Sequence, residues 1–248
     1  MSLIKTVGIV IKHKNLGEND KIITLLSDKL GKVDVVVHGA KSLKNKFMAS
    51  TQPFCYGEYV LFRGKSLYTL SESNIIESFQ NILMDLDKLI YSSYLLELVD
   101  NLTEKDVKNI SILALLLKTF YIITHDEVNI DLLILVVEFK AMAISGYLPQ
   151  VKICLMCGSP VREGYFSIEN GGIVCSSCGK TNKNDFSIDN IHIQYFQLLR
   201  NVKLEDLSKF KYDTEKIEYV KNIMQNYIMY YCDKKFKSLE IIEKIKQR

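Results

Sequence analysis

Two hydrophobic patterns divide the chain. Over about the first 75 residues, apolar and polar positions alternate in short runs that are rich in β-branched residues and separated by turn residues. From about Phe79 onward, the apolar residues recur at helical spacing. The sequence therefore predicts an α+β multidomain protein with an N-terminal β-domain and a mainly helical remainder.

The N-terminal part contains five candidate strands and one long connection. A small barrel fits this number of short strands, and an OB-type barrel, which binds nucleic acid on a strand face and its loops, is favoured. An SH3-like barrel fits the count almost as well. The strands are expected at residues 3–12, 21–26, 33–38, 55–63 and 67–74, with the connection at 39–53.

The remainder predicts a helical bundle with a cysteine-rich insertion. Residues 112–117 are apolar on all sides, which indicates a central buried helix. Helices are expected over residues 79–102, 106–125, 129–147, 189–202, 213–237 and 238–248. The expected domains are a barrel at 1–78, helical parts at 79–150 and 183–248, and a metal-binding module at 151–182.

Four of the six cysteines form two CxxC pairs. Cys154 and Cys157 are followed after 17 residues by Cys175 and Cys178. Two such knuckles supply the four thiolates that tetrahedral Zn²⁺ favours, and Gly158 and Gly179 follow them where a positive φ is often needed. A redox CxxC would open a helix after a strand and would not come as a matched second pair. The spacing predicts a zinc ribbon-like module whose ion is structural.

Composition and charge narrow the class of protein. The hydrophobic content of 48% excludes a disordered or collagen-like chain. Because no stretch of 18 residues lacks charge and the first residues form no apolar leader, we expect a cytoplasmic protein without membrane contact. The net charge is only +3, but residues 1–80 carry 11 Lys/Arg against 7 Asp/Glu, and residues 81–150 carry 5 against 10. The basic N-terminal part is therefore expected to have a different role from the acidic middle.

Catalytic motifs are missing from the sequence. The four histidines stand at no metal-binding or acid–base spacing, and neither GxSxG nor HExxH occurs. Gly64-Lys65-Ser66 resembles the end of a phosphate-binding loop, but Tyr59 stands where that motif needs its first glycine, so a hairpin turn is favoured. We expect that the protein is not an enzyme.

The predicted barrel combines cations with aromatic residues, as single-strand binding requires. Tyr56, Tyr59, Phe62 and Tyr68 could stack on bases, although they could equally fill the core while the lysines serve solubility. The candidate DNA-binding residues are Lys12, Lys14, Lys21, Lys41, Lys44, Lys46, Arg63 and Lys65.

The order of several segments resembles the RecO family of bacterial recombination mediators. The matching segments are residues 8–12, 17–25, 38–41, 52–54, 73–79, 93–98 and 146–149, together with the two CxxC pairs around Gly171-Gly172. Two positions depart from the family pattern. Lys21 stands where arginine is common, which removes a bidentate phosphate contact, and His38 replaces a frequent arginine.

The resemblance implies an OB barrel, a helical domain and a zinc module. It also implies a protein that binds single- and double-stranded DNA, anneals complementary strands and binds RecR. Such proteins help to load RecA onto DNA coated by single-strand-binding protein, without covalent catalysis, and act at the nucleoid. The alternative is a zinc-ribbon interaction adaptor that does not anneal DNA.

The segment 213–237 mixes tyrosines with lysines. An apolar groove edged by lysines would suit the acidic, apolar-ended tail of single-strand-binding protein. An amphipathic helix that packs on the bundle core is the alternative. The candidate partner-binding residues are Lys216, Lys221, Tyr227, Lys234 and Lys235.

Overall fold

A computed structural model describes residues 3–42, 45–209 and 211–246. The chain forms two compact units, Met1–Asp126 with Ser238–Arg248, and Glu127–Lys237. We call the first the barrel unit and the second the bundle unit. In sequence, the bundle unit is thus inserted between two parts of the barrel unit. The domain boundaries that the sequence predicts at residues 78, 150 and 182 are not tested by this division and stay predictions.

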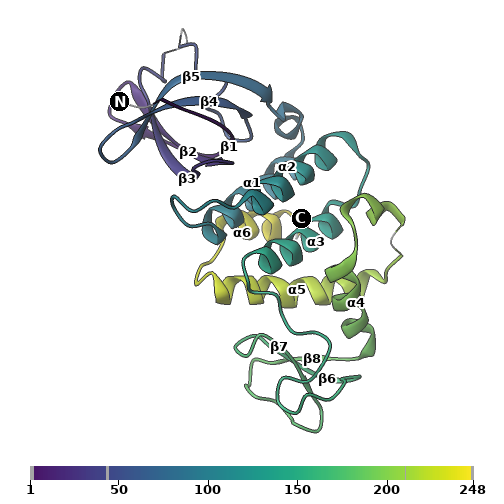
Figure 1. Cartoon of the computed structure of the whole chain (residues 1–248). Coiled ribbons are helices and arrows are strands. Elements are labelled where there is room, and N and C mark those ends of the chain that lie inside the picture. The colour runs from purple at the N-terminus through teal and green to yellow at the C-terminus, as the bar shows by residue number, and fades with distance from the viewer. Residues whose placement is uncertain (1–2, 43–44, 210, 247–248) are drawn as a thin grey trace. The chain divides into compact units, whose positions relative to one another are not determined.

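Five strands form a closed barrel in the barrel unit (Figure 1). β2 (Asp20–Ser27) pairs antiparallel with β1 (Leu3–Leu16) and β3 (Gly31–Val37), while β4 (Tyr56–Arg63) pairs antiparallel with β1 and β5 (Tyr68–Glu77). A parallel pairing of β3 with β5 closes the order β1-β2-β3-β5-β4. This is the OB-type arrangement, so the favoured fold is confirmed and the SH3-like alternative is not.

The barrel interior explains why these segments become strands. Alternate side chains, including Ile23, Leu25, Val33 and Val35, point into one buried core, and burial of each contributes about 1.5–3 kcal/mol. β1 pairs with both β2 and β4 at Gly8 and Ile9. A Cβ at Gly8 would lie 2.6 Å from the Leu26 carbonyl oxygen, so only glycine allows this close approach.

The barrel unit also contains the helices α1 (Leu86–Leu102), α2 (Ile110–His125) and nearly all of α6 (Lys237–Lys246). The expected helix at 79–102 is interrupted. A 3₁₀ turn, η1 (Gln80–Met84), ends at the extended residue Asp85, whose carboxylate accepts the Lys88 N–H and caps α1. The chain returns to this unit at α6, where the Ser238 hydroxyl donates to Glu97 Oε2 at 2.8 Å.

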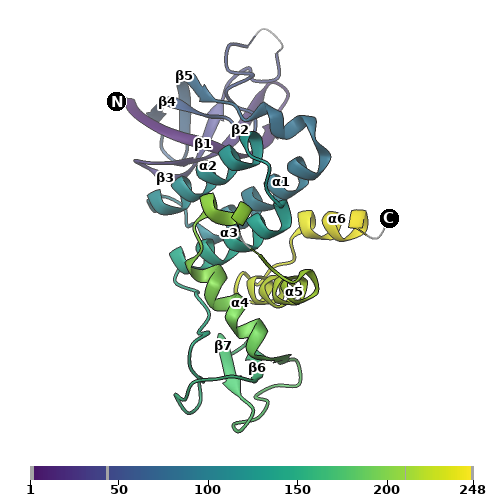
Figure 2. The ribbon, with the colours of Figure 1, turned by 90° about the vertical axis from the view of Figure 1, so that its right-hand side faces the viewer.

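The bundle unit is organised around α3 (Ile130–Ile144). Every residue from Leu132 to Phe139 is buried, so the helix that is covered on all sides is α3 and not the expected 112–117 segment. In that segment only three residues, Ile112, Leu113 and Leu116, are buried. The helices α4 (Asn190–Asn201) and α5 (Thr214–Tyr231) pack on α3 and on each other, and the 3₁₀ segment η2 (Leu204–Lys209) lies between them in sequence (Figure 2).

A three-stranded sheet completes the bundle unit. The predicted hairpin is present as β6 (Gly164–Ser167) and β7 (Gly172–Cys175). A third strand, β8 (Phe186–Ile188), pairs with β6 and was not expected. Among the described residues, no helix is both long and apolar enough to cross a membrane.

Candidate metal centre and nucleic-acid interface

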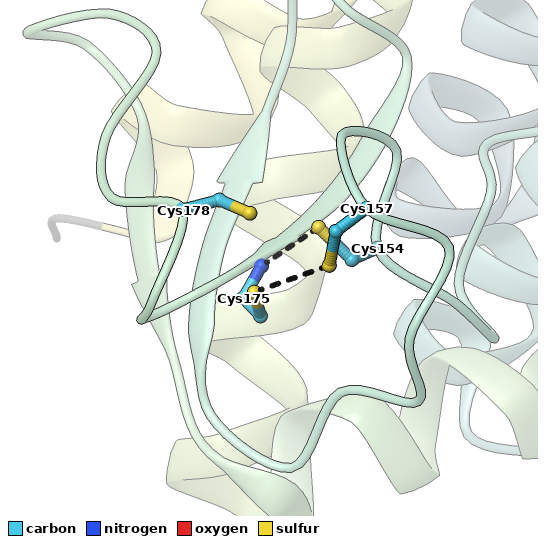
Figure 3. Close-up of side chains that lie close together, drawn as sticks. All are labelled: Cys154, Cys157, Cys175 and Cys178. Atoms are coloured by element: carbon cyan, nitrogen blue, oxygen red, sulfur yellow. Dashed lines mark hydrogen bonds between the residues drawn. The ribbon is translucent and has the colours of Figure 1, made fainter.

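The four predicted ligands come together at one end of the small sheet. Figure 3 shows the sulfurs of Cys154, Cys157, Cys175 and Cys178 pointing toward a common centre, and all four lie within 4.8 Å of one another. The sulfurs of Cys157 and Cys175 are 3.8 Å apart. A tetrahedral ion with Zn–S bonds of about 2.3 Å places its sulfurs about 3.8 Å apart. The donor set and its spacing therefore fit a single four-thiolate metal ion.

Local backbone geometry builds the two knuckles. Gly158 and Gly179 have φ values of 74° and 76°, so the predicted need for positive φ is confirmed at both positions. Each glycine donates its N–H to the carbonyl of the first cysteine of its pair, Cys154 and Cys175 respectively. These turns return each second thiol toward the first.

Backbone N–H groups stabilise a thiolate at the buried end of the cluster. Met156 N and Cys175 N donate to Cys154 Sγ at 3.4 and 3.3 Å. Burial opposes ionisation of Cys154, but these donors and Cys157 N lower its pKa to about 6. The pKa of Cys178 is raised to about 12 because it faces the neighbouring thiols. The thiolate is the form that binds metal, and a bound cation would favour ionisation of all four sulfurs.

The module is anchored to the bundle through its hairpin. Gln150 N donates to the Gly171 carbonyl and Ile173 N donates to the Gln150 carbonyl, both at 2.9 Å. Phe166 of β6 stacks on Phe196 of α4 with ring centroids 5.0 Å apart. The cysteine cluster and the helical core therefore share one packed framework.

One end of the barrel gathers positive charge from three strands and two loops. Lys21 of β2 lies opposite Val37 of β3. Two residues earlier on β3, Val35 lies opposite Tyr68 of β5, which in turn lies opposite Arg63 of β4. With strands about 4.8 Å apart, Lys21 and Arg63 are separated by about 15 Å across the sheet. This is a spacing that a nucleic-acid backbone can span.

Other predicted residues join this end. Lys41 Nζ donates to the Gly17 carbonyl at 2.7 Å, which places the loop after β3 against the β1–β2 turn. Lys65 is exposed in the β4–β5 hairpin, and Lys14 is exposed beside the start of β2. We call the resulting set the basic rim; it consists of Lys14, Lys21, Lys41, Arg63 and Lys65.

Two lysines of the loop after β3 are not part of this set. Lys46 is exposed, and its Nζ lies 4.7 Å from the ring centroid of Phe47, which packs against the barrel core. Lys44 lies outside the described residues. Their predicted contacts with DNA stay predictions.

The outer face of β2 and β3, where OB barrels commonly bind their ligands, is covered here. Lys32 and Lys12 pair with Asp100 of α1 at 3.1 and 3.5 Å, and Asp34 pairs with Lys105 at 2.6 Å. A Cβ at Gly31 would lie 2.2 Å from the Val107 carbonyl oxygen, so the α1–α2 connection touches the start of β3. Of the predicted DNA-binding residues, Lys12 therefore lies beside a covered surface.

Asp20 fixes the loop beside the basic rim, a role that sequence reasoning missed. Its carboxylate accepts the Gly39 N–H and contacts His38 Nδ1, both at 2.8 Å. The Gly39 N–H and the His38 ring hold the pKa of Asp20 below its ordinary value. No local motif reveals this contact, because only the pairing of β2 with β3 brings residues 20 and 38 together.

The predicted partner-binding residues are spread along α5 and the segment after it, and two of them are buried. Lys221 is buried and pairs with Asp131, and Tyr227 is buried and donates to the Tyr147 carbonyl at 2.9 Å. Both side chains make contacts within the bundle unit, and Lys221 also lines a small hollow together with Tyr212 and Thr214. The other three lie at the two ends of α5: Lys216, which pairs with Asp189 at 3.1 Å, and the exposed Lys234 and Lys235.

Comparison with known proteins assigns the chain to a family. A family model for the N-terminal region of recombination protein O matches residues 1–79, and a model for its C-terminal region matches residues 83–240. The chain belongs to the RecO family. The N-terminal RecO match ends at Phe79, where β5 has given way to η1, so it coincides with the barrel.

Individual RecO relatives match along the whole chain. It is 35% identical to DNA repair protein RecO of Clostridium novyi over 248 residues, which cover 100% of this chain and 96% of the relative. It is 33% identical to DNA repair protein RecO of Clostridium perfringens, with 100% of both chains covered. The protein of the same name from Alkaliphilus metalliredigens is 32% identical over 98% of this chain and 100% of the relative. The sequence-based resemblance is thus confirmed.

Proposed function

We propose that this protein is a DNA repair and recombination mediator that binds single- and double-stranded DNA and anneals complementary strands. The observation that carries the proposal is the basic rim, which lies at the end of an OB barrel in a RecO-family chain. The relatives' name, DNA repair protein RecO, supports the same assignment.

The rim supplies a physical mechanism for annealing. Two complementary strands repel each other through their phosphates, and protein cations that replace condensed counterions lower this barrier. Since the five rim residues are distributed over β1, β2, β4 and two loops, they can contact phosphates without reading base sequence. Annealing by this route requires no nucleotide.

We propose that the protein makes and breaks no covalent bonds. Gly64-Lys65-Ser66 lies in the hairpin between β4 and β5, where Gly64 N donates to the Leu67 carbonyl at 3.1 Å. A phosphate-binding loop would instead open a helix. Four thiolate ligands also leave no open coordination position for substrate or water.

We further propose that the ion is Zn²⁺ and that its role is structural. Cys154, Cys157, Cys175 and Cys178 would hold it. It would crosslink the two CxxC loops beside the β6–β7 hairpin. The soft tetrahedral donor set favours zinc over the harder oxygen-seeking cations.

The expected partners follow from the family. We propose that the protein acts with RecR in the cytoplasm, at the nucleoid, to load RecA onto DNA coated by single-strand-binding protein. The acidic tail of single-strand-binding protein would contact Lys216 at one end of α5 or Lys234 and Lys235 at the other, because these positions are accessible.

A strand-annealing assay tests the proposal. Two complementary oligonucleotides carrying a fluorescence donor and acceptor should anneal faster with the protein at low ionic strength, with or without single-strand-binding protein. Lys41→Glu/Lys65→Glu should slow annealing, whereas Lys108→Glu, an exposed change in the α1–α2 connection, should not. A protein that leaves the strands apart, or that shows no salt-dependent DNA binding, would instead fit a zinc-ribbon interaction adaptor.

A further inference from the structure

Large apolar side chains are exposed where β5 passes into α1, and besides Ile75 at 39%, four of them are more than half exposed. The exposed fractions are 52% for Ile76, 53% for Leu83, 87% for Met84 and 62% for Leu86. Single exposed apolar residues are ordinary on protein surfaces, whereas a group of them commonly marks an interaction site. We call these four residues the apolar junction.

The fold holds these side chains outward. Phe79 and Ile82 are buried, and Phe79 packs edge-to-face on Phe120 with ring centroids 5.7 Å apart. In a 3₁₀ turn, residues three apart lie on the same side. Because the inward side is used by Phe79 and Ile82, the following residues Leu83 and Met84 are directed to solvent. Their exposure is therefore built into η1.

Exposed acidic residues flank the apolar junction along the chain. Residues 72–87 contain no lysine or arginine, and the four acids in this segment, Glu72, Glu77, Asp85 and Asp87, are all exposed. This charge repels phosphate, so the surface does not suit nucleic acid. A symmetric contact between two copies would bring the same acids face to face, which also disfavours a self-dimer.

The apolar junction is far from the basic rim within the barrel unit. β5 begins at Tyr68, which pairs with Arg63, and ends at Glu77, next to Ile76. Figure 1 shows β5 running along the barrel toward the helices. Nine residue steps at about 3.3 Å separate these ends by about 30 Å. A protein bound at the junction would therefore leave the rim open to DNA.

We propose that the apolar junction is a docking site for a second protein whose contact surface is apolar and bordered by lysine or arginine. The acidic border selects this charge, and the flexible Met84 side chain adapts to the partner's apolar surface. The site adds a protein-binding face, separate from the DNA-binding face, to the proposed function.

Methionine methyl NMR on the full-length protein tests the site directly. The chain has seven methionines, and Met84→Leu would assign the Met84 signal. The probe is a synthetic amphipathic helix of leucine and lysine, and its control is the same peptide with glutamate for lysine. The lysine peptide should shift the Met84 signal saturably, and the glutamate peptide should leave it unchanged.

Variants separate the apolar contribution from the charge. Met84→Glu/Leu86→Glu should abolish binding of the lysine peptide, measured by fluorescence anisotropy, and Glu72→Lys/Asp87→Lys should weaken it by about tenfold. Ile110→Glu is the matched control, because Ile110 is an exposed apolar residue elsewhere in the barrel unit.

Three results would overturn the proposal: no Met84 shift with the lysine peptide, a Met84 shift that grows with protein concentration alone, or a shift caused by an oligonucleotide. Strand annealing by Met84→Glu/Leu86→Glu should equal that of the unmodified protein. If the peptide does not bind but annealing is intact, only the docking-site proposal is refuted. If annealing fails but the peptide binds, only the proposed DNA-based function is refuted.

Discussion

Phe79 packs edge-to-face on Phe120 of α2 even though its own backbone is left-handed, with φ at 47°. Phe54, which precedes β4 and has a φ of 72°, meets the same ring with centroids 5.5 Å apart. Bulky residues rarely adopt this conformation, and it persists only where surrounding packing holds it. Phe120 therefore joins both ends of the β4–β5 hairpin to α2.

Loss of this ring should destabilise the barrel unit strongly. Phe120 is completely buried, so Phe120→Ala should lower the free energy of unfolding by about 3–5 kcal/mol. Urea unfolding followed by circular dichroism measures the change. Tyr121→Ala, at an exposed neighbour, is the control and should cost far less. Equal losses for the two variants would show that the aromatic cluster does not join the elements.

Removal of the metal should loosen the bundle unit. A strong chelator or Cys154→Ser should expose residues 151–188 to proteolysis and change the tyrosine fluorescence, because the hairpin packs on Phe196 and its Gly171 lies against Tyr231. Metal analysis should give one zinc per chain. Cys232→Ser is the control, since Cys232 lies outside the cluster. A chelated protein that resists protease as well as the untreated one would refute a structural ion.

Because the β2–β3 face is covered, reversing the charge of Lys21 should weaken DNA binding more than reversing the charge of Lys12. Lys21→Glu should weaken single-strand binding and reduce the slope of log affinity against log salt by about 0.7 for each phosphate that the variant no longer neutralises. Lys12→Glu should have a smaller effect, because Lys12 lies beside Asp100 of α1. Fluorescence anisotropy at several salt concentrations measures both. A stronger effect of Lys12→Glu would place the DNA on the β2–β3 face.

Asp34 should contribute to acid sensitivity. Burial opposes its ionisation, but Lys105 and the Thr24 hydroxyl hold its pKa below the ordinary value of 3.8. A depressed folded-state pKa stabilises the fold above the unfolded-state pKa, and this stabilisation is lost as pH falls through the folded-state value. In thermal unfolding, Asp34→Asn should therefore be less stable than the unmodified protein near pH 7, and the difference should shrink toward pH 3. Asp126→Asn changes an exposed residue and is the control; its thermal stability should differ little from that of the unmodified protein.

The features that the sequence predicted depend on local signals. The CxxC spacing, with glycine after each pair, specifies a knuckle within a few residues, and the knuckles have the expected form. Alternating β-branched residues likewise located all five barrel strands, although β1 extends to Leu16 and β5 to Glu77. Turn residues and period-two patterns act over short distances and are therefore visible in sequence.

The features that were missed depend on contacts between distant residues. The 79–102 segment has an unbroken apolar stripe, yet the packing of Phe79 on Phe120 turns the chain before Asp85 caps α1. Asp100 and Lys105 reach the β2–β3 face through contacts that join residues 68 and 71 positions apart. Burial of Lys221 depends on Asp131, which lies 90 residues earlier. Periodicity cannot reveal such pairings because they are set by tertiary structure.

The return of the chain at Ser238 has a consequence for synthesis on the ribosome. Since α6 contributes the Ser238–Glu97 contact to a unit whose remainder ends at Asp126, that unit cannot complete its packing until the last helix has been translated. The intervening bundle unit leaves the exit tunnel after residues 1–126 but before α6, so it can fold while its host still lacks this helix. Nascent chains stalled before α6 should therefore display a folded insertion within an unfinished host, and should be recognised by chaperones accordingly.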